Sequence, residues 1–232
     1  MTGRLFDRDV LARDTLGAAR DLIGARLVRG HGPGARVGRI VEVEAYVGRE
    51  DLASHAHSGR TARNSAMFGL PGRAYVYLTY GMYHCLNVVT EADGRPAALL
   101  LRAVEPISGI DAMRRARLEW LESRFRSRSD DQLPRALSRV AALDEIALAS
   151  GPGLLCQAFS VTRVDNSIDL CDARSELRLE TGDDAPLPMA TGPRIGMGSV
   201  AEPWHSRPWR FYVPGNPAVS HGARRPRPRA ER

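Results

Sequence analysis

Apolar residues in the first part of the chain follow first a helical and then an extended spacing. Positions three or four residues apart between Val10 and Gly24 predict a short amphipathic helix ended by the glycine, with one face formed by Leu11, Thr15, Ala18 and Leu22. The segment Arg39 to Tyr46 alternates with a period of two, which is typical of a strand. One face of this strand is expected to be core and holds Val41, Val43 and Ala45. The other face holds two carboxylates and a phenol, from Glu42, Glu44 and Tyr46.

A long polar loop and a hairpin follow this strand. Gly48 to Pro71 is rich in glycine and lacks periodicity, so we expect a loop of a length that usually serves a function. Ala74 to Thr79 and His84 to Thr90 predict two strands of a β-hairpin, joined around Tyr80-Gly81-Met82. A third strand, Ala97 to Val104, is expected after the next turn.

The middle of the chain predicts two helices. Ile107 to Arg126 has helical spacing, with an apolar face formed by Ile110, Met113, Leu118, Leu121 and Phe125. Ser127 to Gln132 is expected to be a charged linker. Pro134 then opens a second helix, which Gly151 is expected to end.

Short strands and a basic tail are expected in the C-terminal third. The strands are Leu177 to Leu179, Ile195 to Gly198 and Arg210 to Val213. Gly222 to Arg232 contains five arginines and two prolines and is expected to be disordered. Because strands and helices do not alternate regularly, the fold class is α+β. We expect a single compact mixed domain over residues 1–221, built around a curved antiparallel sheet and flanked by helices.

Composition indicates which kind of partner and which cellular compartment to expect. The 232 residues carry a net charge of +6, which allows a polyanionic partner, and every one of the 33 basic side chains is arginine. Three cysteines without C-x-x-C spacing indicate neither a disulfide framework nor a zinc finger. The sequence shows no signal-peptide pattern and no apolar run long enough to cross a membrane. We therefore expect a cytoplasmic protein that has no contact with membranes.

The tyrosines are concentrated in one part of the chain. Five of the six lie between Tyr46 and Tyr83, four of them in the stretch YVYLTYGMYHCLN. Period-two spacing places Tyr75 and Tyr77 on one strand face, and Tyr80 falls at the hairpin tip. The pattern alone leaves two interpretations open. One is an aromatic ladder that packs a sheet; the other is a stacking platform for nucleobases with a wedge at its edge.

Several stretches together resemble the alkyladenine (3-methyladenine) DNA glycosylase family. They follow the family's order and cover most of the chain from Leu11 to Ser220: VEVEAY, the ED…SH spacing that ends at His55, TARNSAMF, YVYLTYGMYHCLN, LLLRAVEP, SGPGLLCQAF and RIGMG…RPWRFYVPGNPAVS. The resemblance implies a protruding hairpin that wedges into double-stranded DNA. A damaged purine is flipped into a pocket, where its N-glycosidic bond is hydrolysed. The resemblance also implies that the protein is a monomer and that the hydrolysis requires neither a metal nor another cofactor.

The resemblance assigns roles to individual positions. Glu44 matches the general base, and Arg102 and the backbone carbonyl of Ile195 match the groups that hold the attacking water. Tyr80 matches the wedge. The pocket positions are the sandwiching residues Tyr46, His55 and Tyr77 and the floor residue Asn87.

Elementary chemistry agrees with this assignment but does not decide it. A carboxylate near C1′ can stabilise an oxocarbenium-like transition state and accept a proton from water. Glu44 shares its strand face with Tyr46, so both can address one ligand. Glu42 lies on the same face and is equally eligible; the motif favours Glu44. Electron-rich tyrosine faces suit cationic bases such as 3-methyladenine and 7-methylguanine in DNA, whereas activity on neutral hypoxanthine or ethenoadenine stays open.

Three alternatives remain open at this point. His55 and His57 form an H-x-H pair that suits a metal, although no further ligand pattern completes a site. LASGPGLLCQAF loosely suggests a helix-hairpin-helix glycosylase, which would be nearly all helical. A non-catalytic architectural module could insert Tyr80 into DNA without releasing a base. The segment from Pro106 to Ser150 also looks longer than the family pattern leads us to expect.

Overall fold

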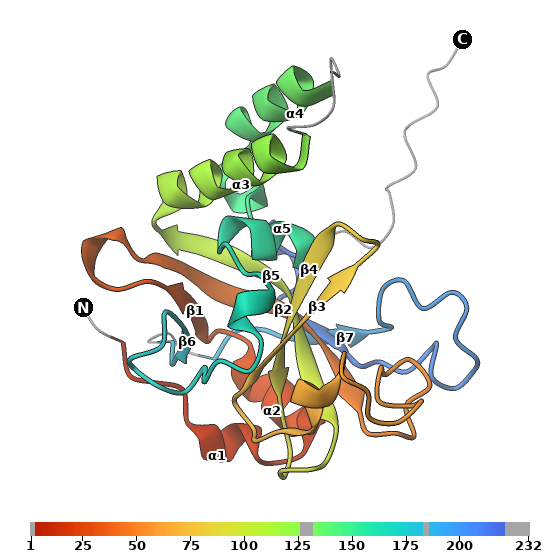
Figure 1. The fold of residues 1–232 in the computed structure, drawn as a ribbon. Helices are drawn as coiled ribbons and strands as arrows, with labels where there is room; N and C mark the ends of the chain where they lie inside the picture. Colours follow the sequence, from red (N-terminus) through yellow and green to blue (C-terminus); the bar gives the residue numbers. More distant parts are fainter. Residues whose placement is uncertain (1–2, 126–131, 183–185, 221–232) are drawn as a thin grey trace.

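The computed structural model describes residues 3–125, 132–182 and 186–220, and these form one mixed α+β domain (Figure 1). Its centre is an open, eight-stranded antiparallel sheet in which β3, β4, β5, β2, β1 and β6 are neighbours in that order, while β8 pairs with β2 and with β7. The strands are β1 (Arg26–Arg29), β2 (Arg36–Val47), β3 (Ala74–Thr79), β4 (Tyr83–Val89), β5 (Ala97–Ser108), β6 (Leu177–Glu180), β7 (Ala190–Gly192) and β8 (Arg210–Tyr212). The predicted fold class and antiparallel sheet are confirmed.

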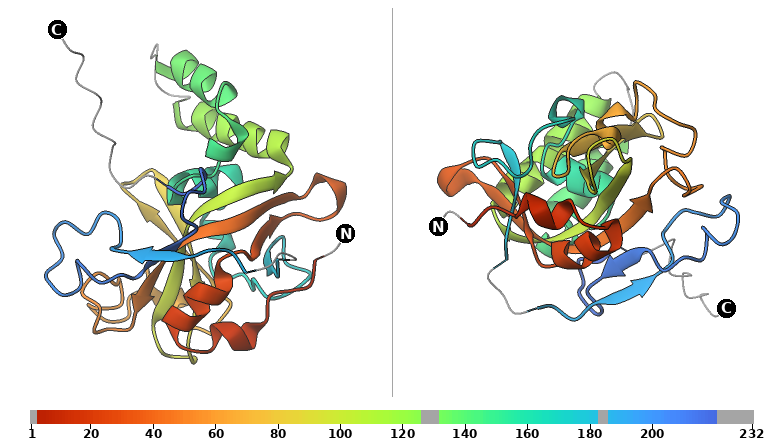
Figure 2. Two further views of the ribbon diagram at one scale, coloured as in Figure 1. Left: turned by 180° about the vertical axis from the view of Figure 1, so that it is seen from behind. Right: turned by 90° about the horizontal axis from the view of Figure 1, so that it is seen from below.

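Five α-helices of the described residues lie at two ends of this sheet (Figures 1 and 2). They are α1 (Arg8–Leu11), α2 (Thr15–Leu22), α3 (Ile110–Phe125), α4 (Gln132–Ala141) and α5 (Pro152–Ala158). Helix α2 packs on β2 and β5, and α5 packs on β4 and β5. Side chains of both helices join one apolar core with the sheet, represented by Leu22, Val43, Leu101 and Leu155. A predominantly helical architecture is therefore wrong for this chain.

Strand β2 is the most enclosed strand of the sheet. On one side β5 pairs with it almost from end to end, and on the other side β1 pairs with its start and β8 with residues Glu42 to Glu44. The register with β5 shifts on both sides of Glu42, as at a β-bulge. For this reason Val41 packs in a different apolar cluster from Val43, and the expected common face of the three small apolar residues is wrong for Val41.

The predicted hairpin is present as β3 and β4. Its turn is closed by a hydrogen bond of 3.0 Å from the Met82 amide to the Thr79 carbonyl. Tyr80 and Gly81 both adopt left-handed backbone conformations, with φ of 49° and 66°. This pair of positive φ angles is typical of the turn that matches the twist of two antiparallel strands. The turn leaves the Tyr80 side chain 87% exposed at the tip.

The helix boundaries differ from those that the sequence predicted. The expected helix from Val10 to Gly24 is two helices, because Asp14 starts α2 as an N-cap that accepts a hydrogen bond of 2.8 Å from the Gly17 amide. Helix α3 begins only after β5 has run to Ser108 and Gly109 has turned the chain with φ of 71°.

The apolar face predicted for the helix after Pro106 is turned inward but is only partly buried. The buried residues of α3 are Met113, Ala116 and Arg117, whereas Leu118, Leu121 and Phe125 are only partly buried. The helix predicted from Pro134 to Gly151 ends at Ala141 and is followed by a 3-10 turn. Gly151 does not end a helix; it is the N-cap of α5.

Two of the three strands predicted in the C-terminal third are present. The strands at Leu177 and Arg210 are confirmed as β6 and β8, but Ile195 to Gly198 forms turns, and the strand of this region is β7. Gly196, which has φ of 82°, interrupts extended backbone there. Strand β1 was not predicted. The linker Ser127 to Gln132, apart from Gln132 at the start of α4, and the tail Gly222 to Arg232 lie outside the described residues.

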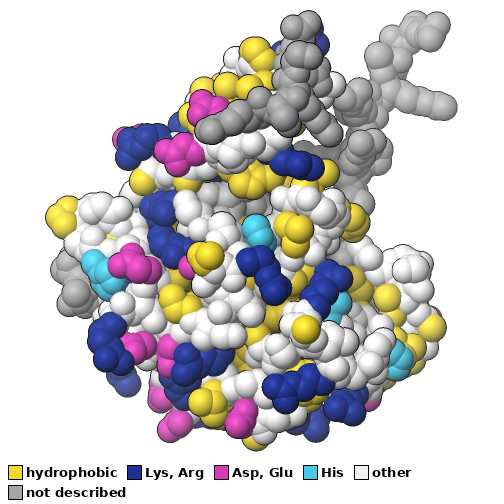
Figure 3. All heavy atoms as spheres, viewed as in Figure 1, with side chains coloured by type: hydrophobic (Ala, Val, Ile, Leu, Met, Phe, Trp, Pro, Cys, Tyr) yellow, Lys and Arg dark blue, Asp and Glu magenta, His cyan; other side chains and the backbone are white. Residues whose placement is uncertain are grey.

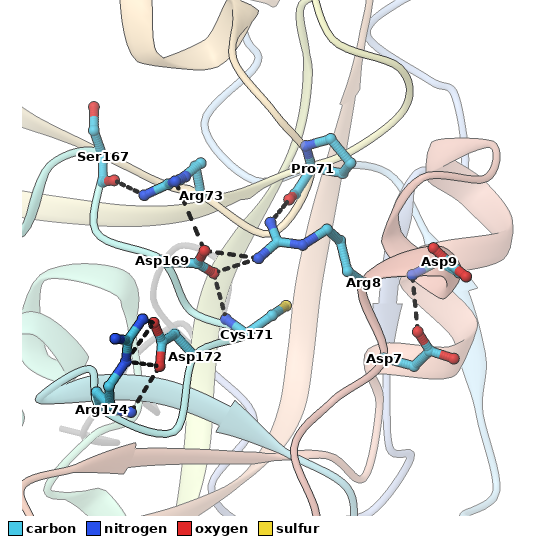
Figure 4. A network of polar contacts seen from close by, with 10 residues as sticks. All are labelled: Asp7, Arg8, Asp9, Pro71, Arg73, Ser167, Asp169, Cys171, Asp172 and Arg174. Carbon is cyan, nitrogen blue, oxygen red and sulfur yellow. Dashed lines mark hydrogen bonds and ion pairs between the residues drawn. The ribbon is translucent and has the colours of Figure 1, made fainter.

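A polar network ties the N-terminal helix to two distant loops (Figure 4). Both Asp169 carboxylate oxygens accept hydrogen bonds of 2.7 Å from Nη2 of Arg8, and Nη1 of Arg8 donates to the Pro71 carbonyl at 2.5 Å. Arg73 approaches the same carboxylate at 3.7 Å. These contacts fix the loop that leads into β3, the strand that carries Tyr75 and Tyr77.

Candidate active site

The Glu44 carboxylate is completely buried in the middle of β2 and is held by two hydrogen-bond donors and one cation. The Tyr46 hydroxyl donates to one oxygen at 2.9 Å, and the Ile195 amide donates to the other at 2.7 Å. Nη1 of Arg102 lies 3.1 Å from that second oxygen. The structure thus brings four of the predicted site residues together. Their contacts fix the orientation of the carboxylate.

Glu42 is equally buried but has different surroundings. Its oxygens accept hydrogen bonds from Nε of Arg102 at 3.0 Å, Nε of Arg210 at 2.6 Å and the Ser220 amide at 2.7 Å. Two cations and an amide therefore surround this carboxylate. In this setting Glu42 ties the strand to the C-terminal part of the domain.

Arg102 joins the two carboxylates from β5. Besides its contacts with Glu42 and Glu44, it donates from Nη2 to the Ser220 hydroxyl at 3.1 Å. Burial lowers the pKa of the guanidinium, but the negative charges of Glu44 and Glu42 outweigh this effect and raise the pKa above its usual value. Arg102 is therefore a permanent cation. Its contact with an attacking water stays a prediction, as does the role of the Ile195 carbonyl.

A cavity of about 120 Å³ opens beside this group. Its lining includes the four predicted pocket residues and four further ones: Tyr46, His55, Tyr77 and Asn87, with Ala53, Met67, Tyr75 and Met197. Tyr46 belongs to both the cavity wall and the carboxylate site. Met67 and Met197 were not identified from the sequence, although both lie inside stretches that carried the family resemblance.

One wall of the cavity is an aromatic cluster. The rings of His55 and Tyr77 meet edge to face with centroids 4.5 Å apart, and Tyr75 and Tyr77 are 5.4 Å apart. The His55 Nδ1 lies 2.9 Å from the Tyr75 hydroxyl. The expected common face of Tyr75 and Tyr77 is confirmed. Asn87 is buried next to this cluster and donates from Nδ2 to the Tyr75 carbonyl at 3.0 Å.

This lining is uncharged near neutral pH. Burial, together with the nearby Glu44 carboxylate, raises the pKa of Tyr46 well above its usual value, and burial raises the pKa of Tyr75 to about 12. Burial likewise raises the pKa of Tyr77. Desolvation and the positive charge of Arg63 lower the pKa of His55, so its imidazole stays neutral to lower pH than an ordinary histidine.

The long loop after β2 is ordered in part by the buried side chain of Asn64. Asn64 donates from Nδ2 to the carbonyls of His55 and Gly59, both at 2.8 Å, which fixes the turn that carries His55. His57 instead lies against the Arg49 carbonyl at 2.9 Å, so the two imidazoles have different partners. Among the described residues, no three His, Cys, Asp or Glu side chains lie close enough together to hold a metal ion.

The hairpin tip and the surrounding surface complete the site. On the side of the molecule that carries the hairpin and the loop after β2, arginine side chains outnumber acidic ones (Figure 3). Exposed arginines of that loop include Arg49, Arg60 and Arg63. Such a surface favours a polyanion. No helix among residues 3–125, 132–182 and 186–220 is long and apolar enough to cross a membrane.

Comparison with known proteins shows to which family the chain belongs. The model of the methylpurine-DNA glycosylase (MPG) family matches residues 9–217. A protein of Methanocella arvoryzae is 47% identical over 94% of this chain and 97% of its own length. Relatives from Alkaliphilus oremlandii and Myxococcus xanthus are 40% and 42% identical, covering 93% and 91% of this chain and 98% and 91% of their own lengths. All three are provisionally named 3-methyladenine DNA glycosylase.

The chain therefore belongs to the methylpurine-DNA glycosylase family. It is a DNA N-glycosylase of base-excision repair, and its substrate is DNA.

Proposed function

We propose that this enzyme releases 3-methyladenine and 7-methylguanine from duplex DNA by means of a water molecule that Glu44 activates. Hypoxanthine and ethenoadenine are further candidate substrates. One observation carries the proposal: a buried carboxylate, fixed by two hydrogen bonds and an ion pair, adjoins an aromatic cavity through Tyr46, which belongs to both. A purine stacked on Tyr46 would place C1′ of the attached deoxyribose close to that carboxylate.

The chemistry follows from this geometry. Cleavage of the bond between C1′ and the base nitrogen leaves positive charge on the sugar, which the Glu44 carboxylate stabilises. A water that attacks C1′ transfers a proton to Glu44 as the new C–O bond forms. Arg102, Ile195 and Tyr46 hold the carboxylate in a single orientation, so little reorganisation is needed during the reaction.

Recognition rests on charge as well as shape. Methylation at N3 or N7 makes the purine cationic while it is attached to the sugar, and aromatic faces attract cations. The neutral forms of His55 and the tyrosines add no positive charge of their own to the wall. The methylated base also leaves readily as a neutral molecule, so its release needs no general acid.

The exposed Tyr80 serves as the wedge in this proposal. Extruding a base costs a few kcal/mol, and a ring that fills the vacated space offsets part of that cost. The arginine-rich surface beside the hairpin binds the phosphates on either side of the lesion. We propose that a single copy of the chain carries out all of these steps, as the compact site contains every group that they need.

Release of methylated purines from alkylated duplex DNA tests the proposal, with wild type and Glu44→Gln compared. The substitution keeps size and hydrogen bonding but removes the charge and the proton acceptor, so we expect a loss of ~10²–10⁴-fold in the excision rate. Binding to the damaged duplex should persist. Excision by Glu44→Gln at the wild-type rate would exclude this mechanism, and DNA bending without any base release by wild type would favour an architectural role.

A further inference from the structure

A column of alternating aromatic and guanidinium groups extends behind Tyr46. The Cζ of Arg194 lies 4.8 Å from the Tyr46 ring centre and 5.1 Å from the Trp209 ring centre. The Cζ of Arg207 lies 4.6 Å from the same Trp209 ring and 4.3 Å from that of Trp204. Tyr46 lines the cavity, whereas Arg194 lies over its ring and is not part of the cavity lining.

Arg194 is locked in this place by a buried ion pair. Its guanidinium donates to both oxygens of Asp51, at 2.6 Å and 2.9 Å, and to the Ala45 carbonyl at 2.9 Å. The side chains of Arg194 and Asp51 are both completely inaccessible. Nε of Arg194 is buried without a hydrogen-bond partner among the described residues.

The same pair connects segments that are far apart in the sequence. Asp51 also accepts hydrogen bonds from the Val47 and Ala53 amides and so organises the start of the loop that carries His55. The neighbour of Arg194 is Ile195, whose amide holds Glu44. Figures 1 and 2 show the loop after β2 and the segment between β7 and β8 side by side.

We propose that Arg194 is a positioning residue for base recognition, which holds the Tyr46 ring in the plane that a flipped purine stacks on. This inference rests on the proposed function, in which Tyr46 is a wall of the base pocket. A ring that is supported from behind loses less conformational freedom when a base binds to its front. Asp51 neutralises the guanidinium, so the positive charge behind the ring does not oppose a cationic base in front of it.

A double-mutant cycle tests whether Arg194 acts through Tyr46. The measurement is the single-turnover release of 7-methylguanine at saturating enzyme, with Arg194→Met introduced into wild type and into Tyr46→Leu. In wild type we expect a loss of about tenfold, which is typical of coupling between residues in contact. In the Tyr46→Leu background the same change should cost less than about twofold, because the ring that Arg194 supports is gone.

A loss by the same factor in both backgrounds would overturn the inference, since a general structural role does not depend on the Tyr46 ring. So would an unchanged rate in the wild-type background. Failure of the proposed function is distinguishable from either outcome. It would appear as unimpaired release by Glu44→Gln, or as no release by wild type, before Arg194 is altered.

Two further variants make the cycle specific. Arg178→Met removes another buried arginine, which pairs with Glu180 at 2.8 Å outside the cavity lining, and it should change the rate equally in both backgrounds. Arg194→Lys keeps a cation for Asp51 but lacks the flat guanidinium. We expect Arg194→Lys to lower the release rate in the wild-type background. In the Tyr46→Leu background it should lower the rate no further. It also provides the cycle if Arg194→Met does not fold. Full activity of Arg194→Lys would overturn the role of stacking.

Discussion

Two glutamates that the sequence presents as equivalents have separate roles in the structure. Glu44 and Glu42 alternate along one strand, and spacing alone makes either eligible as the base. Their partners differ: Glu42 receives two arginines and a backbone amide, whereas Glu44 adjoins the cavity through Tyr46. The contact with Tyr46 places Glu44 next to the cavity in which a base would bind. The partners therefore support Glu44 as the base.

This difference predicts separate effects of two similar substitutions. Glu42→Gln leaves the buried Arg102 and the partly buried Arg210 with less compensation, so we expect the free energy of unfolding to fall by ~3 kcal/mol, as for a broken buried ion pair. The excision rate of the folded fraction should fall far less than it does in Glu44→Gln. Urea denaturation followed by single-turnover excision separates the two quantities. If Glu42→Gln is the more damaging to excision, the assignment of the base is wrong.

His55 predicts the pH dependence of excision. Its pKa is lowered in the folded protein, so the neutral ring persists below the ordinary value of about 6.5 and is lost as the pH falls further. The protonated ring would repel a cationic base and would also destabilise the fold, since the unfolded chain takes up the proton more readily. Release of 7-methylguanine should therefore decline at acid pH.

The matched variant for this prediction is His55→Gln, which does not titrate. Its rate at neutral pH will be lower because part of the wall is lost, but its acid decline should begin at lower pH than in wild type. The pH profile of kcat/KM on one substrate is the measurement. An acid limb that is identical in both proteins would show that another group controls it.

At the scale of elements, local pattern and long-range pairing differ in how far the sequence reveals them. The hairpin was predictable because its strands and turn are adjacent, and Gly81 suits the left-handed turn. The burial of Glu42 and Glu44 was not predictable. It depends on β8, which comes from near the end of the chain and covers β2 at those two residues. Pairs such as Asp51 with Arg194 leave no local periodic signal at all.

The hairpin carries a prediction of its own. Tyr80→Ala should weaken binding to duplex that contains a lesion. Without the ring that fills the vacated space, the equilibrium shifts back from the flipped base to the stacked base. Affinity should fall more for lesions in stable base pairs than for lesions in mismatched pairs, because extruding a mismatched base costs less free energy. Tyr80→Phe keeps the ring and serves as the control, with binding close to wild type. Affinities on the two kinds of duplex decide the matter, and an equal loss on both contradicts a wedge.

At the scale of the whole molecule, the absence of lysine from the sequence limits the chemistry. Bifunctional glycosylases attack C1′ with an amine, form a Schiff base and then expel the 3′ phosphate by β-elimination. Lysine is the side chain that supplies this amine, since burial can lower its proton affinity. All 33 basic residues of this chain are arginines, which remain protonated and are not nucleophilic near neutral pH. The chain therefore contains no lysine amine that could form such a Schiff base.

We accordingly predict a monofunctional enzyme that leaves an intact abasic site. Incubation with abasic duplex DNA and borohydride should trap no covalent complex above background, because reduction captures only a Schiff base. A lysine-dependent bifunctional glycosylase serves as the positive control for trapping. The terminal amine is the remaining candidate nucleophile, so the experiment is repeated after the amino terminus has been blocked. A strong trapped band that persists after blocking would falsify this prediction, and with it the attack by water that Glu44 is proposed to activate.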